Sequence, residues 1–177
     1  MRALTPMERF NINDVILYLG TGICHIDDIR TENFGTEPKE YFVMHAVSDP
    51  KSVIFVPVDS ERLTSCMLEL LSPNEINELI ESAEGKELEW IPDNKQRMLK
   101  FSEIISSGNR LDILIIFKAL SIMKRELEEQ KKKFYATDER LLNAASKIVV
   151  EEFSFVLKIG PNDVVPYILD RVKNSVT

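Results

Sequence analysis

The sequence predicts an α+β protein in which a β-rich domain comes first and an all-helical domain follows. Before about residue 65, short runs of β-branched and aromatic residues alternate with turn-forming residues. After Leu63 the apolar residues recur at helical spacing instead. The chain has 177 residues, 44% of them hydrophobic, which suffices for one medium core or two small ones. We therefore expect one domain at residues 8–65 and a second at 66–177.

The strands of the first domain are predicted from three apolar runs, at residues 15–18, 41–44 and 53–56. Between them lie turn formers such as Gly20-Thr21-Gly22 and Asn33-Phe34-Gly35. Four or five strands in about 55 residues would be marginal as an open two-stranded piece, so we expect a strongly bent sheet or a small barrel.

The first helices of the second domain have clear start and stop signals. Ser72-Pro73-Asn74-Glu75 combines a cap, a proline at the first helical position and a glutamate three residues after the cap. Gly85 should end that helix. A second helix is expected from Asn94 until Ser106-Ser107-Gly108 interrupts its apolar spacing.

Three further helices are expected after residue 109. A long one should span about residues 110–131, with an apolar first half inside the core and a charged second half in solvent. Thr137 should cap the next, which Gly160-Pro161 should end. Asn162 or Asp163 should cap a short last helix.

The charge is unevenly distributed. The net charge is −7, which on its own argues against nucleic acid as a partner. Residues 1–94 carry 7 basic and 18 acidic side chains, whereas residues 95–133 carry 10 basic and 5 acidic ones. This asymmetry favours two roles, with the basic middle segment suited to a polyanion and the acidic front to a protein.

Several function classes are not expected. Cys24 and Cys66 cannot form a disulfide framework, and no stretch is apolar enough to span a bilayer, so we expect a cytoplasmic protein without membrane insertion. Cys24 and His25 are neighbours on a strand and should point to opposite faces, so they cannot act as nucleophile and base. Gly20-Thr21-Gly22 has no helix after it to hold a dinucleotide phosphate. We expect no enzyme and no cofactor.

The two histidines could meet across the sheet. No third ligand is evident beside His25 and His45, so no metal site is predicted.

Two stretches of the chain resemble the CarD family of bacterial transcription regulators, whose N-terminal module is shared with the transcription-repair coupling factor. The run from Phe10 to Tyr18, followed by Gly22-Ile23, is similar to the family opening F-x-x-G-D-x-V-x-Y-x-x-x-G-V. Asn13 stands where the family usually has glycine, and asparagine is among the few residues that tolerate a positive φ. The strand pattern around Tyr41 and Val56-Pro57-Val58 is also similar.

The second stretch lies in the helical part, so that the resemblance covers about residues 8–157. It comprises Trp90, Arg97, Phe101, Ser107-Gly108-Asn109, Asp138-Glu139-Arg140-Leu141-Leu142, Ala145 and Glu152-Phe153.

The resemblance implies a Tudor-like or SH3-like barrel that docks on the β subunit of bacterial RNA polymerase, with Arg30 and Phe55 as candidate contacts. It also implies a helical domain that contacts promoter DNA independently of sequence and stabilises the open complex. The candidate DNA contacts are Trp90, Lys95, Arg97 and Lys100, the three basic residues on or near one helix face. We expect a monomer.

Each candidate residue could instead have a purely structural role. Trp90 could be a half-buried aromatic that pins its connector to the helical core, and the three basic residues could be solvated helix positions. Arg30 could be a loop-edge arginine, and Phe55 could belong to the core. The alternative function is therefore an acidic protein–protein adaptor that never contacts DNA.

Overall fold

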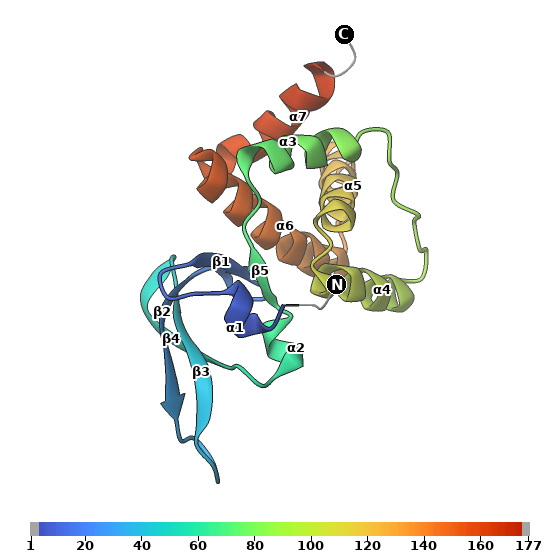
Figure 1. Ribbon diagram of the computed structural model, residues 1–177. Helices are drawn as coiled ribbons and strands as arrows, with labels where there is room; N and C mark the ends of the chain where they lie inside the picture. Colours follow the sequence, from blue (N-terminus) through green and yellow to red (C-terminus); the bar gives the residue numbers. More distant parts are fainter. Residues whose placement is uncertain (1–3, 175–177) are drawn as a thin grey trace. The chain divides into compact units, whose positions relative to one another are not determined.

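The computed structural model describes the backbone of residues 4–174, and Figure 1 shows its elements. All strands lie before residue 70 and the long helices lie after it, so the predicted order of β followed by α is confirmed. The chain divides into two compact units, Met1–Leu70 and Leu71–Thr177. None of the helices in the described part combines the length and apolar composition needed to cross a membrane.

The first unit is built on a five-stranded antiparallel sheet with the strand order β4-β3-β2-β1-β5. Within the described residues, β4 and β5 are the two edges and do not pair with each other, so closure into a barrel is not confirmed. The strands are β1 (Val15–Tyr18), β2 (Gly22–Glu32), β3 (Lys39–Ala46), β4 (Asp49–Pro57) and β5 (Met67–Glu69).

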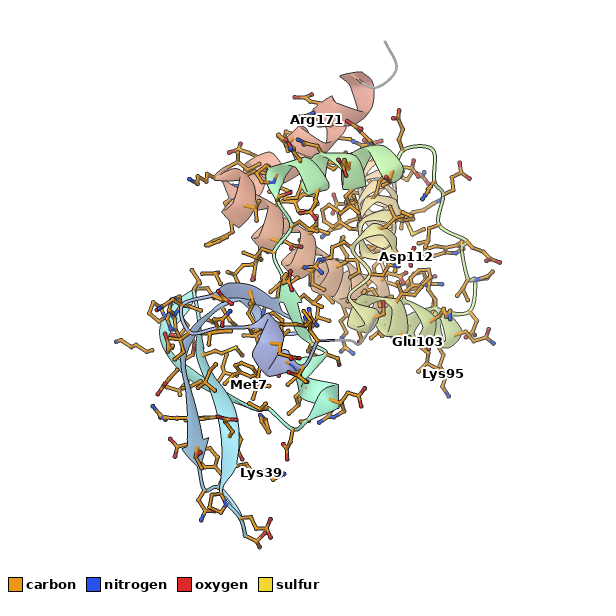
Figure 2. The ribbon with its side chains drawn as sticks, viewed as in Figure 1. Met7, Lys39, Lys95, Glu103, Asp112 and Arg171 are labelled. Atoms are coloured by element: carbon orange, nitrogen blue, oxygen red, sulfur yellow. The ribbon has the colours of Figure 1, made fainter. Side chains whose placement is uncertain are left out.

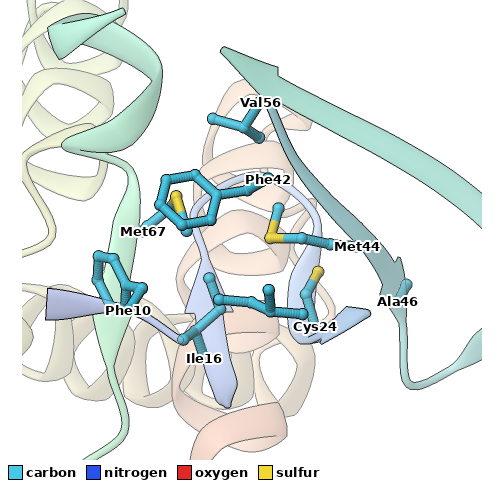
Figure 3. Close-up of a cluster of buried hydrophobic side chains, with 9 residues drawn as sticks. Phe10, Ile16, Cys24, Phe42, Met44, Ala46, Val56 and Met67 are labelled. Atoms are coloured by element: carbon cyan, nitrogen blue, oxygen red, sulfur yellow. The ribbon is translucent and has the colours of Figure 1, made fainter. Parts of the chain in front are cut away.

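The core of this unit lies on one face of the sheet, because alternate residues of each strand point to the same side. Figure 3 shows the buried side chains gathered there. Two short helices, α1 (Pro6–Arg9) and α2 (Glu61–Thr64), complete the unit. The cluster contains Phe10, Ile16, Cys24, Ile26, Phe42, Met44, Ala46, Val56 and Met67. Cys24 faces this core, which confirms that Cys24 and His25 point to opposite faces.

The turn before β1 shows why asparagine is accepted in place of glycine. Asn13 has φ 76°, in the left-handed region that few residues other than glycine and asparagine occupy. Its backbone N–H donates to the Ile26 carbonyl (2.8 Å), and the Ile26 N–H donates to the Asp14 carbonyl (2.9 Å). The loop is thereby tied to β2.

The second unit consists of helices, and two of its predicted signals are confirmed. Ser72 Oγ accepts from the Glu75 N–H (3.3 Å), and Glu75 Oε2 accepts from the Ser72 N–H (2.7 Å), which forms the capping box. Gly108, at φ 74°, ends α4 in the left-handed conformation. The helices are α3 (Pro73–Ser82), α4 (Asn94–Ser107), α5 (Arg110–Glu129), α6 (Ala136–Leu157), the 3-10 turn η1 (Pro161–Asp163) and α7 (Val164–Asn174).

Both predicted boundaries of α6 were wrong by a few residues. Tyr135 is the N-cap position, so Thr137 lies inside the helix, and its buried hydroxyl has no hydrogen-bond partner among the described residues. Lys158, at φ 56°, ends the helix before Gly160 is reached. Asn162 and Asp163 lie in η1, directly before α7.

A buried ion pair joins α5 and α6. Arg110 donates to Glu152 through Nη2 (2.9 Å) and Nε (3.2 Å), and the Glu152 side chain is fully buried. Glu152 Oε1 also accepts from the Leu71 N–H (3.1 Å). This carboxylate therefore ties the start of the second unit to both long helices.

Candidate interaction surfaces

The face of the sheet opposite the first unit's core carries an aromatic cluster, formed by Phe34, Tyr41 and Phe55. The ring centroids lie 4.8 Å apart for Phe34 and Phe55, 5.3 Å for Phe34 and Tyr41, and 6.1 Å for Tyr41 and Phe55, all in edge-to-face geometry. Phe55 alternates with the core residues Ile54 and Val56, so it is not part of that core. Phe34 remains 61% exposed, and the cluster is therefore presented at the surface of the unit.

Arg30 lies at the border of the aromatic cluster. It is the cross-strand partner of Tyr41, and its guanidinium carbon lies 5.9 Å from the Phe55 ring centroid. Nε donates to Glu32 (2.7 Å) and Nη1 to Asp28 (3.4 Å). The hydrogen bond to Glu32 is the main cause that raises the pKa of Arg30 above its ordinary value. The structure thus brings together the two residues that the sequence nominated for polymerase contact.

The edge strand β4 adds a second feature to this unit. In the described residues β4 pairs only with β3, so its other side offers backbone donors and acceptors. Val53, on this strand, is 63% exposed. Main-chain hydrogen bonding by an added strand is a common mode of peptide recognition.

In the second unit, the assignment of Arg97 as a DNA contact was wrong. Its side chain is only 2% exposed and forms a bidentate pair with Asp138, with Nε–Oδ1 and Nη2–Oδ2 distances of 2.8 Å. Nη1 donates to the carbonyls of Ile91 (2.6 Å) and Pro92 (3.1 Å), and Nη2 also donates to Asn94 Oδ1. All five guanidinium donors are therefore used inside the protein.

The predicted shared face of the three basic residues is also wrong. Each residue turns an α-helix by about 100°, so Lys95 and Arg97 lie about 160° apart, and Lys95 and Lys100 about 140° apart. Lys95 is exposed near the start of α4, as Figure 2 shows. Lys100 is exposed as well and lies 3.3 Å from Glu103. Two of the three basic side chains thus remain at the surface, on different faces.

Trp90 is partly exposed, and Arg97 and Phe101 pack against its ring. The residue is 38% exposed. Its ring centroid lies 4.2 Å from the Arg97 guanidinium carbon and 6.4 Å from the centroid of the Phe101 ring. Because Arg97 also binds the carbonyls of Ile91 and Pro92, it fixes the connector that carries the indole. Arg97 and Asp138 are therefore positioning residues for Trp90. Both residues were noted in the sequence analysis, but their ion pair was not predicted.

A shallow groove lies beside Trp90. Its apolar lining comes from Leu88, Trp90, Ala119, Ile122 and Met123. Lys86, Glu87 and Lys118 also border it, and the Lys118 ammonium group donates to the carbonyls of Ala83 (3.0 Å) and Lys86 (3.1 Å). The groove therefore presents more apolar surface than positive charge.

The sheet carries a third potential metal ligand beside the two histidines, one that was not identified from the sequence. His25 and His45 are direct cross-strand partners, and Asp27 lies between their rings. Potential ligand atoms of these three residues all lie within 4.8 Å of one another. Among the described residues this group could hold a metal ion.

The comparisons with known proteins bear on the first unit. No curated protein matches the chain. Residues 10–67 match the family model of the CarD-like/TRCF RID domain. The matched segment runs from Phe10 in the core to Met67 at the start of β5, and so includes four complete strands. The match supports a CarD-like RNA polymerase-interacting domain in this segment, and with it a role in transcription with RNA polymerase as the partner.

Proposed function

We propose that this protein is a non-enzymatic transcription regulator of the bacterial cytoplasm that binds the β subunit of RNA polymerase through residues 10–67. The observation that carries this proposal is the family match together with the aromatic cluster and Arg30. We further propose that the curved sheet is of the Tudor-like or SH3-like type, and that the protein acts as a monomer.

The polymerase contact is assigned to the face that carries Arg30 and Phe55. Arginine and aromatic residues are enriched among the side chains that dominate binding energy at protein interfaces. Here the rings are braced edge to face and the guanidinium is held by two carboxylates, so little side-chain freedom is lost on binding. The adjacent edge of β4 could add main-chain hydrogen bonds to a polymerase strand.

This part of the proposal is tested by binding of the full chain to the isolated polymerase β lobe. Phe55→Ala and Arg30→Ala should each weaken binding by about 10-fold or more, the effect of losing a central interface side chain. Arg62→Ala is the control, because Arg62 is an exposed cation of the same unit that lies on α2 and not on the sheet. Equal affinities for all three variants would contradict the assignment.

The helical unit is proposed to contact promoter DNA at the edge of the melted region, without reading its sequence. Trp90 is partly exposed and its ring is packed on Arg97, which suits a side chain that must wedge against a base step. Lys95 and Lys100 are exposed cations on the neighbouring helix and could neutralise phosphates. In this way the protein would stabilise the open complex.

Open-complex lifetime on a promoter measures this second part. Trp90→Ala should shorten the lifetime while leaving polymerase binding unchanged. Phe155→Ala is a suitable control, because Phe155 is another partly exposed aromatic of the same unit. An unchanged lifetime in the Trp90 variant would count against the wedge.

A specific observation favours the alternative function, a protein–protein adaptor without DNA contact. The burial of Arg97 removes one of the proposed phosphate ligands, and the groove beside Trp90 is mainly apolar. Salt separates the two functions. A complex with several phosphate contacts loses affinity steeply as salt rises, whereas an apolar protein interface does not.

A further inference from the structure

The two histidines of the chain, His25 and His45, face each other across β2 and β3. Their ring centroids lie 5.3 Å apart with an interplanar angle of 33°. His25 Nδ1 lies 2.8 Å from Asp27 Oδ1, and His45 Nδ1 lies 2.7 Å from Asp27 Oδ2. Three potential metal-ligating side chains therefore converge on one point of the sheet.

A β-bulge places Asp27 there. His25 pairs with His45 and Ile26 with Met44, but Val43 then pairs with Asp28, so Asp27 is the extra residue of β2. A bulge redirects the side chains around it, and bulges are common next to functional sites. The bulge also changes which residues of β2 face the core. After Cys24 and Ile26, the next core-facing residue is Ile29 and not Asp28. Asp27 thus stays on the face of the two histidines.

We propose that His25, Asp27 and His45 form a binding site for a divalent transition-metal ion of the zinc class. Two imidazole nitrogens and one carboxylate oxygen are a ligand set that such ions prefer, and three protein ligands leave a fourth position for water or a partner's side chain. The three residues are anchored on paired strands, so the ligand backbones are already in place. The site shares no residue with the polymerase and DNA contacts proposed above and does not depend on them.

Binding rearranges or releases protons on the two rings and involves no redox change. Each imidazole must be neutral and offer the Nδ1 lone pair, with its remaining proton on Nε2. The Nδ1 proton of a neutral ring moves to Nε2 through solvent, or an imidazolium releases it to solvent, and the cation takes its place between the ring and Asp27. The donor atoms must move apart slightly, because zinc–nitrogen and zinc–oxygen bonds of about 2.0–2.2 Å replace hydrogen bonds.

The test is a titration of the full-length protein with ZnCl₂, followed by NMR of the imidazole protons. The chain contains only two histidines, so the spectrum reports on this site alone. We expect both imidazole signals to shift together and to saturate at about one equivalent. Co²⁺, monitored by visible absorption, gives an independent readout of coordination geometry.

Variants then locate the ligands. Loss of a residue that only hydrogen-bonds a metal ligand lowers metal affinity by roughly 10- to 100-fold. His45→Gln and Asp27→Asn remove a ligand itself, so each should weaken zinc binding by more than that. Cys66→Ser is the control, because Cys66 is a partly accessible thiol of the same unit and should leave binding unchanged. Imidazole signals of the unaltered protein that do not respond to excess zinc would overturn the proposal. Retained affinity in the ligand variants would also overturn it.

Discussion

The buried pair between Arg97 and Asp138 gives the sharpest stability prediction. Asp138→Asn keeps the size of the side chain but removes the charge that Arg97 faces, at a position only 1% exposed. Removing one partner of a buried ion pair typically costs about 3–5 kcal/mol, because the other charge remains buried without compensation. Since a neutral amide can still accept a hydrogen bond, we expect the lower end, about 3 kcal/mol, or roughly a 100-fold change in the folding equilibrium.

The neighbouring residue provides a matched control. Glu139 pairs with Lys124 at 2.8 Å, but the two side chains are 39% and 34% exposed. Exposed pairs contribute between about 0 and 1 kcal/mol, so Glu139→Gln should have little effect. Both substitutions replace one carboxylate by an amide at adjacent positions in α6.

Urea unfolding followed by tryptophan fluorescence is the assay, because Trp90 is the single tryptophan and contacts Arg97 directly. Asp138→Asn should lower the unfolding midpoint strongly and change the emission of the folded state. Equal midpoints for the two variants would refute the view that Arg97 and Asp138 hold the connector in place.

Three further predictions concern local structure. Ser72→Ala should destabilise the protein by about 1 kcal/mol, measured by thermal unfolding, because it removes the cap of α3; no change would mean that the cap contributes nothing. The hydrogen bond from the Ser72 N–H lowers the pKa of Glu75 from 4.5. The wild-type protein should therefore be more stable than Glu75→Gln above about pH 4.5, and this difference should disappear as the pH falls through the lowered pKa. A difference in unfolding free energy that does not change with pH would contradict this. Lys158→Gly should stabilise the protein by about 0.5–1 kcal/mol in chemical denaturation, because glycine adopts φ 56° without the strain of a side chain; destabilisation would show that the lysine stem makes contacts of greater value.

Features that depend on neighbouring residues could be predicted from the sequence. The capping box at Ser72, the left-handed turn at Gly108 and the tolerance of Asn13 for a positive φ are all set within a few residues. The two ends of α6 are also local, yet they were misplaced. Tyr135 takes the N-cap position without a side-chain cap hydrogen bond, and Lys158 adopts a conformation that usually favours glycine. Sequence preference therefore indicated the helix but not its last residue.

Features that depend on distant residues could not be predicted in the same way. Arg97 has the pattern of a surface cation, and its charged partner inside the protein, Asp138, lies 41 positions later. The histidine pair was anticipated across the sheet, but the bulge that brings in Asp27 arises from the pairing of two strands. A His-x-Asp spacing on a strand was the one signal that could have revealed the third ligand.

The first unit is proposed to bind RNA polymerase through the face that carries the aromatic cluster. The most direct measurement places a photo-crosslinking amino acid at Phe34, which is exposed, and in a separate variant at Met7 of α1, which is partly exposed on the same unit. With polymerase holoenzyme on a promoter, we expect the Phe34 probe to crosslink to the β subunit and the Met7 probe to crosslink far less. Adducts at Met7 with none at Phe34 would contradict the account.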